Sequence, residues 1–219
     1  GSHLPDVALV SPIFHNENLV AFVSNIAHHA DIGGMAPGSM AGGMTEGYQE
    51  GLRIPPIRIM NEGKIVDDVL DMILLNVRVP DERRGDYMAQ IAANLLGERR
   101  FADLLEQWSA ASFNEGAEAI IAAVARRMRA GIAELPDGEF IFHDVMDDDG
   151  MGTTDIPIAV RILVDGNQIL FDFAGSAPQV SGNINVSYAG LQASVLFALK
   201  VLVDPEGPTN HGMLDPVRI

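Results

Sequence analysis

The chain has 219 residues, of which 47% are hydrophobic, so it is long enough to bury a core as one domain or as an incomplete domain. Its 30 acidic and 14 basic residues give a formal net charge of −16, which argues against binding to nucleic acid or to an anionic membrane. It contains no cysteine, which excludes disulfides and thiolate chemistry within it, and no apolar run approaches the about 18 residues of a membrane span. We therefore expect a cytoplasmic protein with no nucleic-acid or membrane partner.

The first expected element is a β-hairpin. Two apolar runs rich in β-branched residues, 7–14 and 19–26, are separated by the turn-like segment 15–18. A turn centred between Asn16 and Glu17 sets the register of the two strands.

In that register His28 lies opposite Pro5, and His3 is its diagonal neighbour on the same face. Asp6 has the wrong parity for this face in a regular strand, so it joins them only if the strand begins irregularly, which Pro5 permits because it lacks an N–H. Two imidazoles and one carboxylate can hold a divalent metal and leave coordination positions open. Two alternatives stay open: residues 1–3 as the remnant of a cloned tag, and His28 as a hydrogen-bonded structural histidine.

The hairpin is followed by a loop, 31–47, that holds six glycines and can approach a ligand closely or serve as a flexible connection. Asp31 follows His28 by three residues, where it can accept a proton, orient a water or simply cap a turn, and we take it as the candidate catalytic residue. His29 faces away from His28 in an extended strand, which favours a place beside the ligands or in the core. Three loop residues are further candidates for supporting the ligands or lining the substrate: Gly33, Gly34 and Ser39.

The middle of the chain is predicted to be mainly helical. A short strand over 54–60 and a turn over 61–63 precede it. Apolar residues then recur at steps of three and four, Leu95 and Leu96 among them. This spacing predicts amphipathic helices over 66–74, over 81–108 as one long or broken helix, and over roughly 114–135. Four arginines of the second helix either grip a substrate carboxylate or a partner, or form the solvated face or helix-end pairs that such charges more often make: Arg83, Arg84, Arg99 and Arg100.

The last third of the chain returns to strands and ends with a helix. Strands are predicted over 140–145, 156–164 and 168–173, the last two joined by an Asp-Gly turn, and a buried helix over 188–203. The acidic run 147–149 lacks the alternating ligands and closing Glu of a calcium loop, which favours a solvated turn.

These elements predict an α+β fold of β-hairpins and a mixed sheet with a packed helical layer. By pattern the chain divides into a hairpin and Gly-rich loop (1–65), a helical region (66–136) and a second hairpin region with the buried helix (137–219).

Several motifs together resemble those of one enzyme family. In chain order they are Leu4–Val7, Ala27–Gly34, Pro37–Met40, Tyr48–Pro56, Asp86–Asn94, Gly97–Arg100, Asp172–Ser176 and Gly182–Asn185. They resemble the central region of the B subunits of hydantoinases and 5-oxoprolinases over nearly the whole chain, which implies that the chain is an internal fragment of a longer subunit.

The resemblance implies a set of metal ligands and a partner. His3, Asp6 and His28 match ligands of a divalent metal (Zn, Mn or Fe), whereas a further upstream Asp ligand of the family has no counterpart here. The implied partner is an A-type subunit that binds ATP and phosphorylates the amide carbonyl, within a hetero-oligomer. The chain has no Walker A motif, as expected if ATP binding belongs to that partner.

The function implied by the resemblance is that of the metal-bearing B-type subunit of an ATP-dependent cyclic amidohydrolase, which opens a hydantoin, 5-oxoproline or lactam ring. A bound metal would lower the pKa of water toward neutrality and supply hydroxide for ring opening. Two alternatives are a subunit of an ATP-dependent ketone carboxylase and a non-catalytic scaffold that docks the partner.

Overall fold

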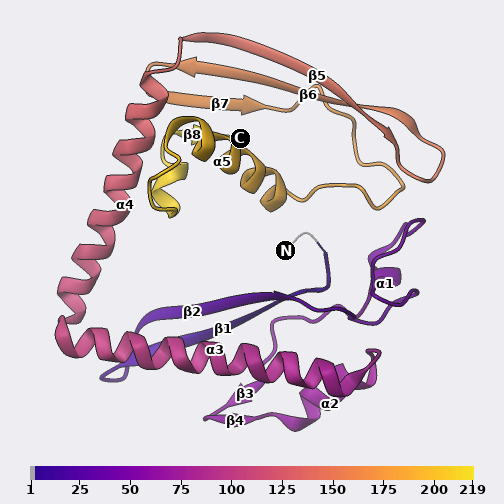
Figure 1. Ribbon diagram of the computed structural model, residues 1–219, viewed down its shortest axis with the longest axis vertical. Helices are drawn as coiled ribbons and strands as arrows, with labels where there is room; N and C mark the ends of the chain where they lie inside the picture. Colours follow the sequence, from indigo (N-terminus) through magenta and orange to yellow (C-terminus); the bar gives the residue numbers. More distant parts are fainter. Residues whose placement is uncertain (1–2) are drawn as a thin grey trace. The chain divides into compact units, whose positions relative to one another are not determined.

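The structure is a computed structural model that describes residues 3–219 (Figure 1). The chain forms two compact units, the first ending at Ala110 and the second running from Ala111 to Ile219. This division follows compactness, whereas the three segments of the sequence analysis follow the type of secondary structure, and the helical segment 66–136 contributes to both units. Both units combine helices with strands, so the predicted α+β class is confirmed.

The first unit packs one long helix on a two-stranded hairpin (Figure 1). Its elements are β1 (Asp6–His15), β2 (Asn18–His28), α1 (Gly47–Glu50), β3 (Met60–Asn61), β4 (Lys64–Ile65), α2 (Asp67–Leu75) and α3 (Pro80–Gln107). The predicted hairpin and both helices are confirmed, and the second helix is continuous.

The register of the hairpin differs from the predicted one. Next to the turn the predicted pairing holds, but β2 then carries one extra residue, Val20, as a bulge. Beyond the bulge the pairing is shifted by one residue, and Asp6 lies directly opposite His28. The predicted pairing of His28 with Pro5 is therefore wrong, and the shift brings the Asp6 side chain to the face of the ladder that His28 occupies.

The strand predicted over 54–60 is also wrong. Only Met60–Asn61 pairs, as β3 with β4, and residues 54–58 are irregular. Pro55 and Pro56 have no N–H to give to a ladder, and this outweighs the apolar pattern of the segment. The turn predicted over 61–63 is confirmed, with Glu62 and Gly63 both at positive φ.

The buried face of α3 is partly polar. Its buried residues are Arg83, Tyr87, Gln90, Ile91, Asn94 and Leu105. The sequence predicts an apolar face that includes Leu96, whose side chain is in fact 51% exposed. The prediction fails because amide side chains of α3 form hydrogen bonds with the hairpin, so polar residues occupy part of the buried face.

The second unit packs two helices on a sheet. Its elements are α4 (Ala110–Ala133), β5 (Gly138–Asp148), β6 (Thr154–Asp165), β7 (Gln168–Asp172), α5 (Tyr188–Val203), the 3-10 helix η1 (His211–Leu214) and β8 (Val217–Arg218). The sheet has the order β5-β6-β7-β8, and because β8 runs parallel to β7, the predicted mixed sheet is confirmed. Its core joins α4, α5, η1 and the sheet through Val124, Met128, Ile132, Val164, Ile169, Phe171, Val195, Leu199 and Met213.

Two predictions for the second unit need correction. The helix predicted to be buried, α5, buries only Val195 and Leu199, and its Phe197 is 73% exposed, because a continuous apolar sequence does not reveal which face meets the core. In the acidic run predicted as a solvated turn, Asp149 is buried and accepts hydrogen bonds from three backbone N–H groups.

Among residues 3–219, no helix combines the length and the apolar character needed to cross a bilayer.

Close packing of α3 on the hairpin generates a prediction about two glycines of this helix. A Cβ atom at Gly97 would lie 2.5 Å from Cγ2 of Val23 on β2, whereas a Cβ at Gly85 would meet no described atom within 4 Å. We expect Gly97→Ala to lower the free energy of unfolding by about 1–3 kcal/mol. Gly85→Ala, the matched control, should raise it by about 0.5–1 kcal/mol because alanine favours the helix. Urea titrations followed by circular dichroism test this, and equal effects of the two substitutions would contradict it.

Candidate metal centre

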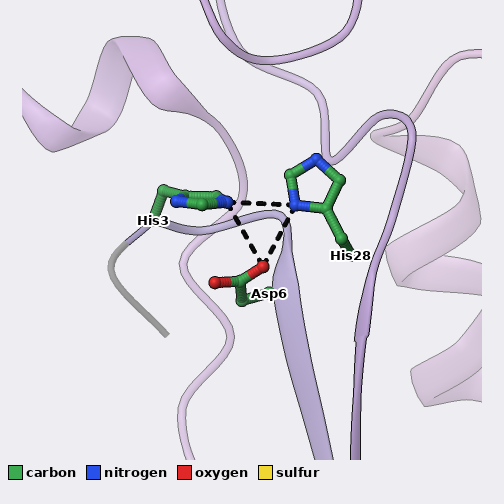
Figure 2. Close-up of side chains that lie close together, drawn as sticks. All are labelled: His3, Asp6 and His28. Carbon is green, nitrogen blue, oxygen red and sulfur yellow. Dashed lines mark hydrogen bonds and ion pairs between the residues drawn. The ribbon is translucent and has the colours of Figure 1, made fainter. Parts of the chain in front are cut away.

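Three side chains converge at the open end of the hairpin, opposite its turn (Figure 2). Nε2 of His3 lies 3.0 Å from Nδ1 of His28 and 3.2 Å from Oδ1 of Asp6, and the distance from Nδ1 of His28 to the same Asp6 oxygen is 3.0 Å. They form the one cluster of metal-ligating side chains found among the described residues, and they are the three predicted from the sequence.

The three ligand atoms cannot all be satisfied by hydrogen bonds among themselves. If both ring nitrogens carry hydrogen and donate to Asp6, the contact between His3 and His28 joins two donors. If one ring nitrogen instead accepts from the other, its lone pair faces the lone pairs of the Asp6 carboxylate. A cation removes this conflict because all three atoms can then direct a lone pair at it.

The spacing of these atoms fits the ligand shell of a small divalent metal. Two donors that each lie about 2.1 Å from a metal and subtend about 90° are about 3.0 Å apart. The side chains of Asp6, His3 and His28 are 19%, 28% and 51% exposed, so one side of the cluster is open to solvent. Partial burial alone would raise the pKa of Asp6, but the hydrogen bond with His28 and the charges of the two imidazoles outweigh it and hold the pKa below its usual value.

The start of β1 is irregular, as the participation of Asp6 requires. The N–H of Asp6 donates to the carbonyl of His3 over 3.2 Å, and this turn brings the His3 ring back to the strand. The fully buried Pro5 accepts a hydrogen bond from the N–H of His29, which ties the start of β1 to the end of β2. Glu50 accepts from the N–H of Leu4 over 2.6 Å and holds the same turn from the other side.

His29 lies in the core beside the cluster, as expected, and is no part of it. Its Nε2 is hydrogen bonded to Oε1 of Gln90 over 2.9 Å, and its ring packs on Tyr87 with centroids 4.5 Å apart.

Asp31 is held within the Gly-rich loop by hydrogen bonds. Its carboxylate accepts from the N–H groups of Gly33, Gly38 and Arg78 and from the Arg78 guanidinium. Burial would raise the pKa of Asp31, but the hydrogen bonds from Arg78, Gly33 and Gly38 outweigh it and lower the pKa to about 2. This environment is that of a structural brace, and the proton-accepting role of Asp31 stays a prediction.

Arg78 was missed by the sequence reasoning. Its guanidinium donates to Asp31 and to the carbonyl groups of Gly33, Gly34 and Ala36, so it fills the centre of the loop. One signal was available: Arg78 stands between two valines shortly before Pro80, and a lone cation in an apolar run needs a partner.

The other three loop candidates have structural surroundings. A Cβ atom at Gly33 would lie 2.4 Å from the carbonyl oxygen of Asn76, and one at Gly34 would lie 2.5 Å from that of Gln49, so only glycine fits at these positions. The buried hydroxyl of Ser39 accepts from the N–H of Ile32 and donates to the carbonyl of Gly33. A substrate-lining role for these residues stays a prediction.

Arg84, Arg99 and Arg100 lie on the exposed face of α3, as the commoner alternative predicts, whereas Arg83 is buried and does not belong to a solvated face. Arg83 pairs with Glu82 and Asp86, Arg84 with Asp71 and Arg100 with Asp103, while Arg99 donates to the carbonyl of Leu95.

Comparison with known proteins places this geometry in context. The family model described as Hydantoinase B/oxoprolinase matches residues 1–219. The chain is 30% identical over 245 residues to 5-oxoprolinase 1 of Arabidopsis thaliana, a match that covers 100% of this chain and 19% of the plant protein.

Two solved structures are similar in fold. The crystal structure of ATP-dependent caprolactamase from Pseudomonas jessenii matches with a TM-score of 0.90 and 31% identity over 100% of this chain and 38% of that one. An acetone carboxylase in its nucleotide-free form matches with a TM-score of 0.88 and 18% identity, over 99% of this chain and 30% of that one, and at this identity the likeness shows the fold alone. The chain spans less than two-fifths of the length of each of these three proteins.

The surroundings of Asp31 predict acid-sensitive stability. Because the pKa of Asp31 is about 2 in the folded chain and 3.8 ordinarily, its ionised form stabilises the fold above pH about 4, and this stabilisation is lost as the pH falls toward about 2. The difference in pKa corresponds to about 2 kcal/mol. We expect Asp31→Asn to lower the free energy of unfolding by about this amount at pH 7, with a deficit that shrinks below pH about 4.

Urea unfolding of both proteins at a series of pH values measures this deficit. Asp147→Asn is the matched control, since Asp147 is exposed and should change stability little at any pH. A deficit for Asp31→Asn that stays constant down to pH about 3 would contradict the prediction.

Proposed function

Because the chain belongs to the hydantoinase B/oxoprolinase family, we propose that it carries the metal centre of a B-type subunit in an ATP-dependent cyclic amidohydrolase. The observation that carries this proposal is the convergence of His3, Asp6 and His28 at metal-ligand spacing on the solvent side of the hairpin. Two neutral donors and one anion suit a divalent ion of Zn, Mn or Fe.

The residues of the chain have distinct tasks in this proposal. His3 and His28 offer ring nitrogens, and Asp6 offers a carboxylate oxygen that offsets one positive charge of the ion. When bound, a divalent metal supplies Lewis-acid polarisation of a carbonyl and makes water more acidic. The exposure of His28 leaves room for a small cyclic amide to approach from solvent. Asp31 and Arg78 brace the loop that follows β2.

The partner and substrate classes rest on the relatives. A 5-oxoprolinase and an ATP-dependent caprolactamase are both at least 30% identical to this chain, and both names describe enzymes of cyclic amides. One further relative, from Pseudomonas jessenii, is named caprolactamase subunit beta. We therefore propose a hetero-oligomer with an ATP-binding A-type subunit and a hydantoin, 5-oxoproline or lactam substrate.

The two other candidate functions have weaker support. The likeness to acetone carboxylase concerns the fold alone, so it does not favour ketone carboxylation. A non-catalytic docking scaffold has no need of a solvent-facing cluster of two imidazoles and a carboxylate.

The proposal predicts that His28→Ala, made in the full-length polypeptide that contains this sequence, abolishes metal retention and ATP-dependent ring opening. Little stability should be lost because the His28 side chain is 51% exposed. Elemental analysis, thermal unfolding and turnover of hydantoin, 5-oxoproline and caprolactam in the presence of the partner and ATP measure these effects.

His15→Ala is the matched control, since His15 lies at the turn end of the same hairpin. It should keep both metal and activity. Wild-type metal content in His28→Ala would refute the ligand assignment, and metal-free wild-type protein that still binds its partner would favour the scaffold.

A further inference from the structure

The side chain of Gln90 contacts both strands of the hairpin next to the metal cluster. Its Nε2 donates to the carbonyl of Val7 over 2.9 Å, and its Oε1 lies 2.9 Å from Nε2 of His29. Val7 follows Asp6 on β1, and His29 follows His28 at the end of β2. One buried amide of α3 therefore holds the backbone next to one ligand and the side chain next to another.

The orientation of this amide is fixed by its partners. Both Nε2 hydrogens of Gln90 are used, one by the carbonyl of Val7 and one by Oδ1 of Asn25 at 2.8 Å. Oε1 must therefore face His29, and Nε2 of His29 must carry the hydrogen. The other ring nitrogen of His29 is buried and has no hydrogen-bond partner among the described residues, so Gln90 makes the one hydrogen bond of this ring.

A second amide, one helical turn along α3, contacts the hairpin farther from the cluster. Nδ2 of Asn94 donates to Oγ of Ser11 over 3.1 Å, and its Oδ1 accepts from Asn25 over 2.7 Å. Ser11 lies well inside the ladder, five residues beyond Asp6. Asn94 therefore supports the middle of the hairpin and Gln90 supports its open end.

The candidate ligands Asp6 and His28 lie at the open end of the hairpin, so hydrogen bonds that hold this end affect their positions most. Asp6 and His28 form the last pair of the ladder, and beyond them the N–H of His29 donates to the carbonyl of Pro5 over 2.8 Å. Terminal pairs of an isolated hairpin open at low free-energy cost, and each opening separates the two ligands.

We propose that Gln90 is a positioning residue that keeps Asp6 and His28 opposed by holding Val7 and His29. This inference rests on the proposed function for its role in metal binding. The side-chain amide of Gln90 forms hydrogen bonds with Val7, Asn25 and His29, and none of these is a candidate metal ligand. Gln90 therefore acts on the ligands through their neighbours.

The test compares Gln90→Met with Asn94→Leu in the full-length polypeptide. Each substitution removes one buried amide of the same helix and keeps roughly its volume, so both should lower the melting temperature of the metal-free protein. Affinity for Zn²⁺ is measured by competition with a chromophoric chelator. We expect Gln90→Met to weaken it by about 10–100-fold, as losses of groups that orient ligands do, and Asn94→Leu to leave it nearly unchanged.

Amide hydrogen exchange of the metal-free proteins gives a readout that needs no metal. Gln90→Met should speed exchange in peptides that cover residues 4–8 and 26–30, and Asn94→Leu in those that cover 9–13 and 21–25. Equal losses of Zn²⁺ affinity in the two variants, or unchanged affinity in Gln90→Met, would overturn the proposal. Absence of Zn²⁺ binding by the wild type would overturn the proposed function instead, and the exchange pattern alone would then decide whether Gln90 holds the open end.

Discussion

In a two-stranded antiparallel ladder, residues directly opposite each other share a face, and a shift of one residue exchanges the faces. The bulge at Val20 makes such a shift between the turn and the open end of the hairpin. Without it Asp6 would lie opposite Ala27 and would point away from His28. The candidate metal centre therefore depends on one extra residue in β2, far from the ligands themselves.

A ligand set at the open end of a hairpin needs support from outside the ladder. The buried amides of Gln90 and Asn94 give this support and also select the register, because each hydrogen bond has one partner at one place along the strands. If only apolar side chains joined α3 to the hairpin, the two strands could slip by two residues with little loss of packing. Such a slip would leave every side chain on its present face of the ladder but would separate Asp6 from His28. On the other side, Glu50 holds the turn that carries His3. The polar residues on the buried face of α3 thus reduce its hydrophobic burial, but they fix the register of the hairpin.

Much of the fold could be predicted from the sequence, because periodicity and turn residues report directly on local structure. The hairpin turn, α3, the sheet hairpin and α5 all lie where the pattern indicates, although the pattern left open whether α3 is continuous or broken. The bulge could not be predicted, since the run Leu19–Ala21 has no glycine or other signal for an extra residue.

The candidate site was predicted in part. His3, Asp6 and His28 come from spacing and from the family resemblance, whereas the partners that orient them do not. Gln90 looks like an ordinary surface residue in sequence, because nothing local shows that its amide is buried against a hairpin distant in the chain. For Arg78 the flanking valines indicate that a partner is needed, but they do not show that the partner is Asp31, 47 residues away.

The alternation of side chains along β2 meets two requirements that one residue alone cannot meet. A ligand needs an accessible lone pair, and its backbone needs to be fixed. His28 is 51% exposed and offers the lone pair, whereas His29, the next residue, is 2% exposed and is hydrogen bonded to α3. Because neighbouring side chains of a strand point to opposite faces, the anchoring of His29 fixes the backbone of His28 without covering its ring.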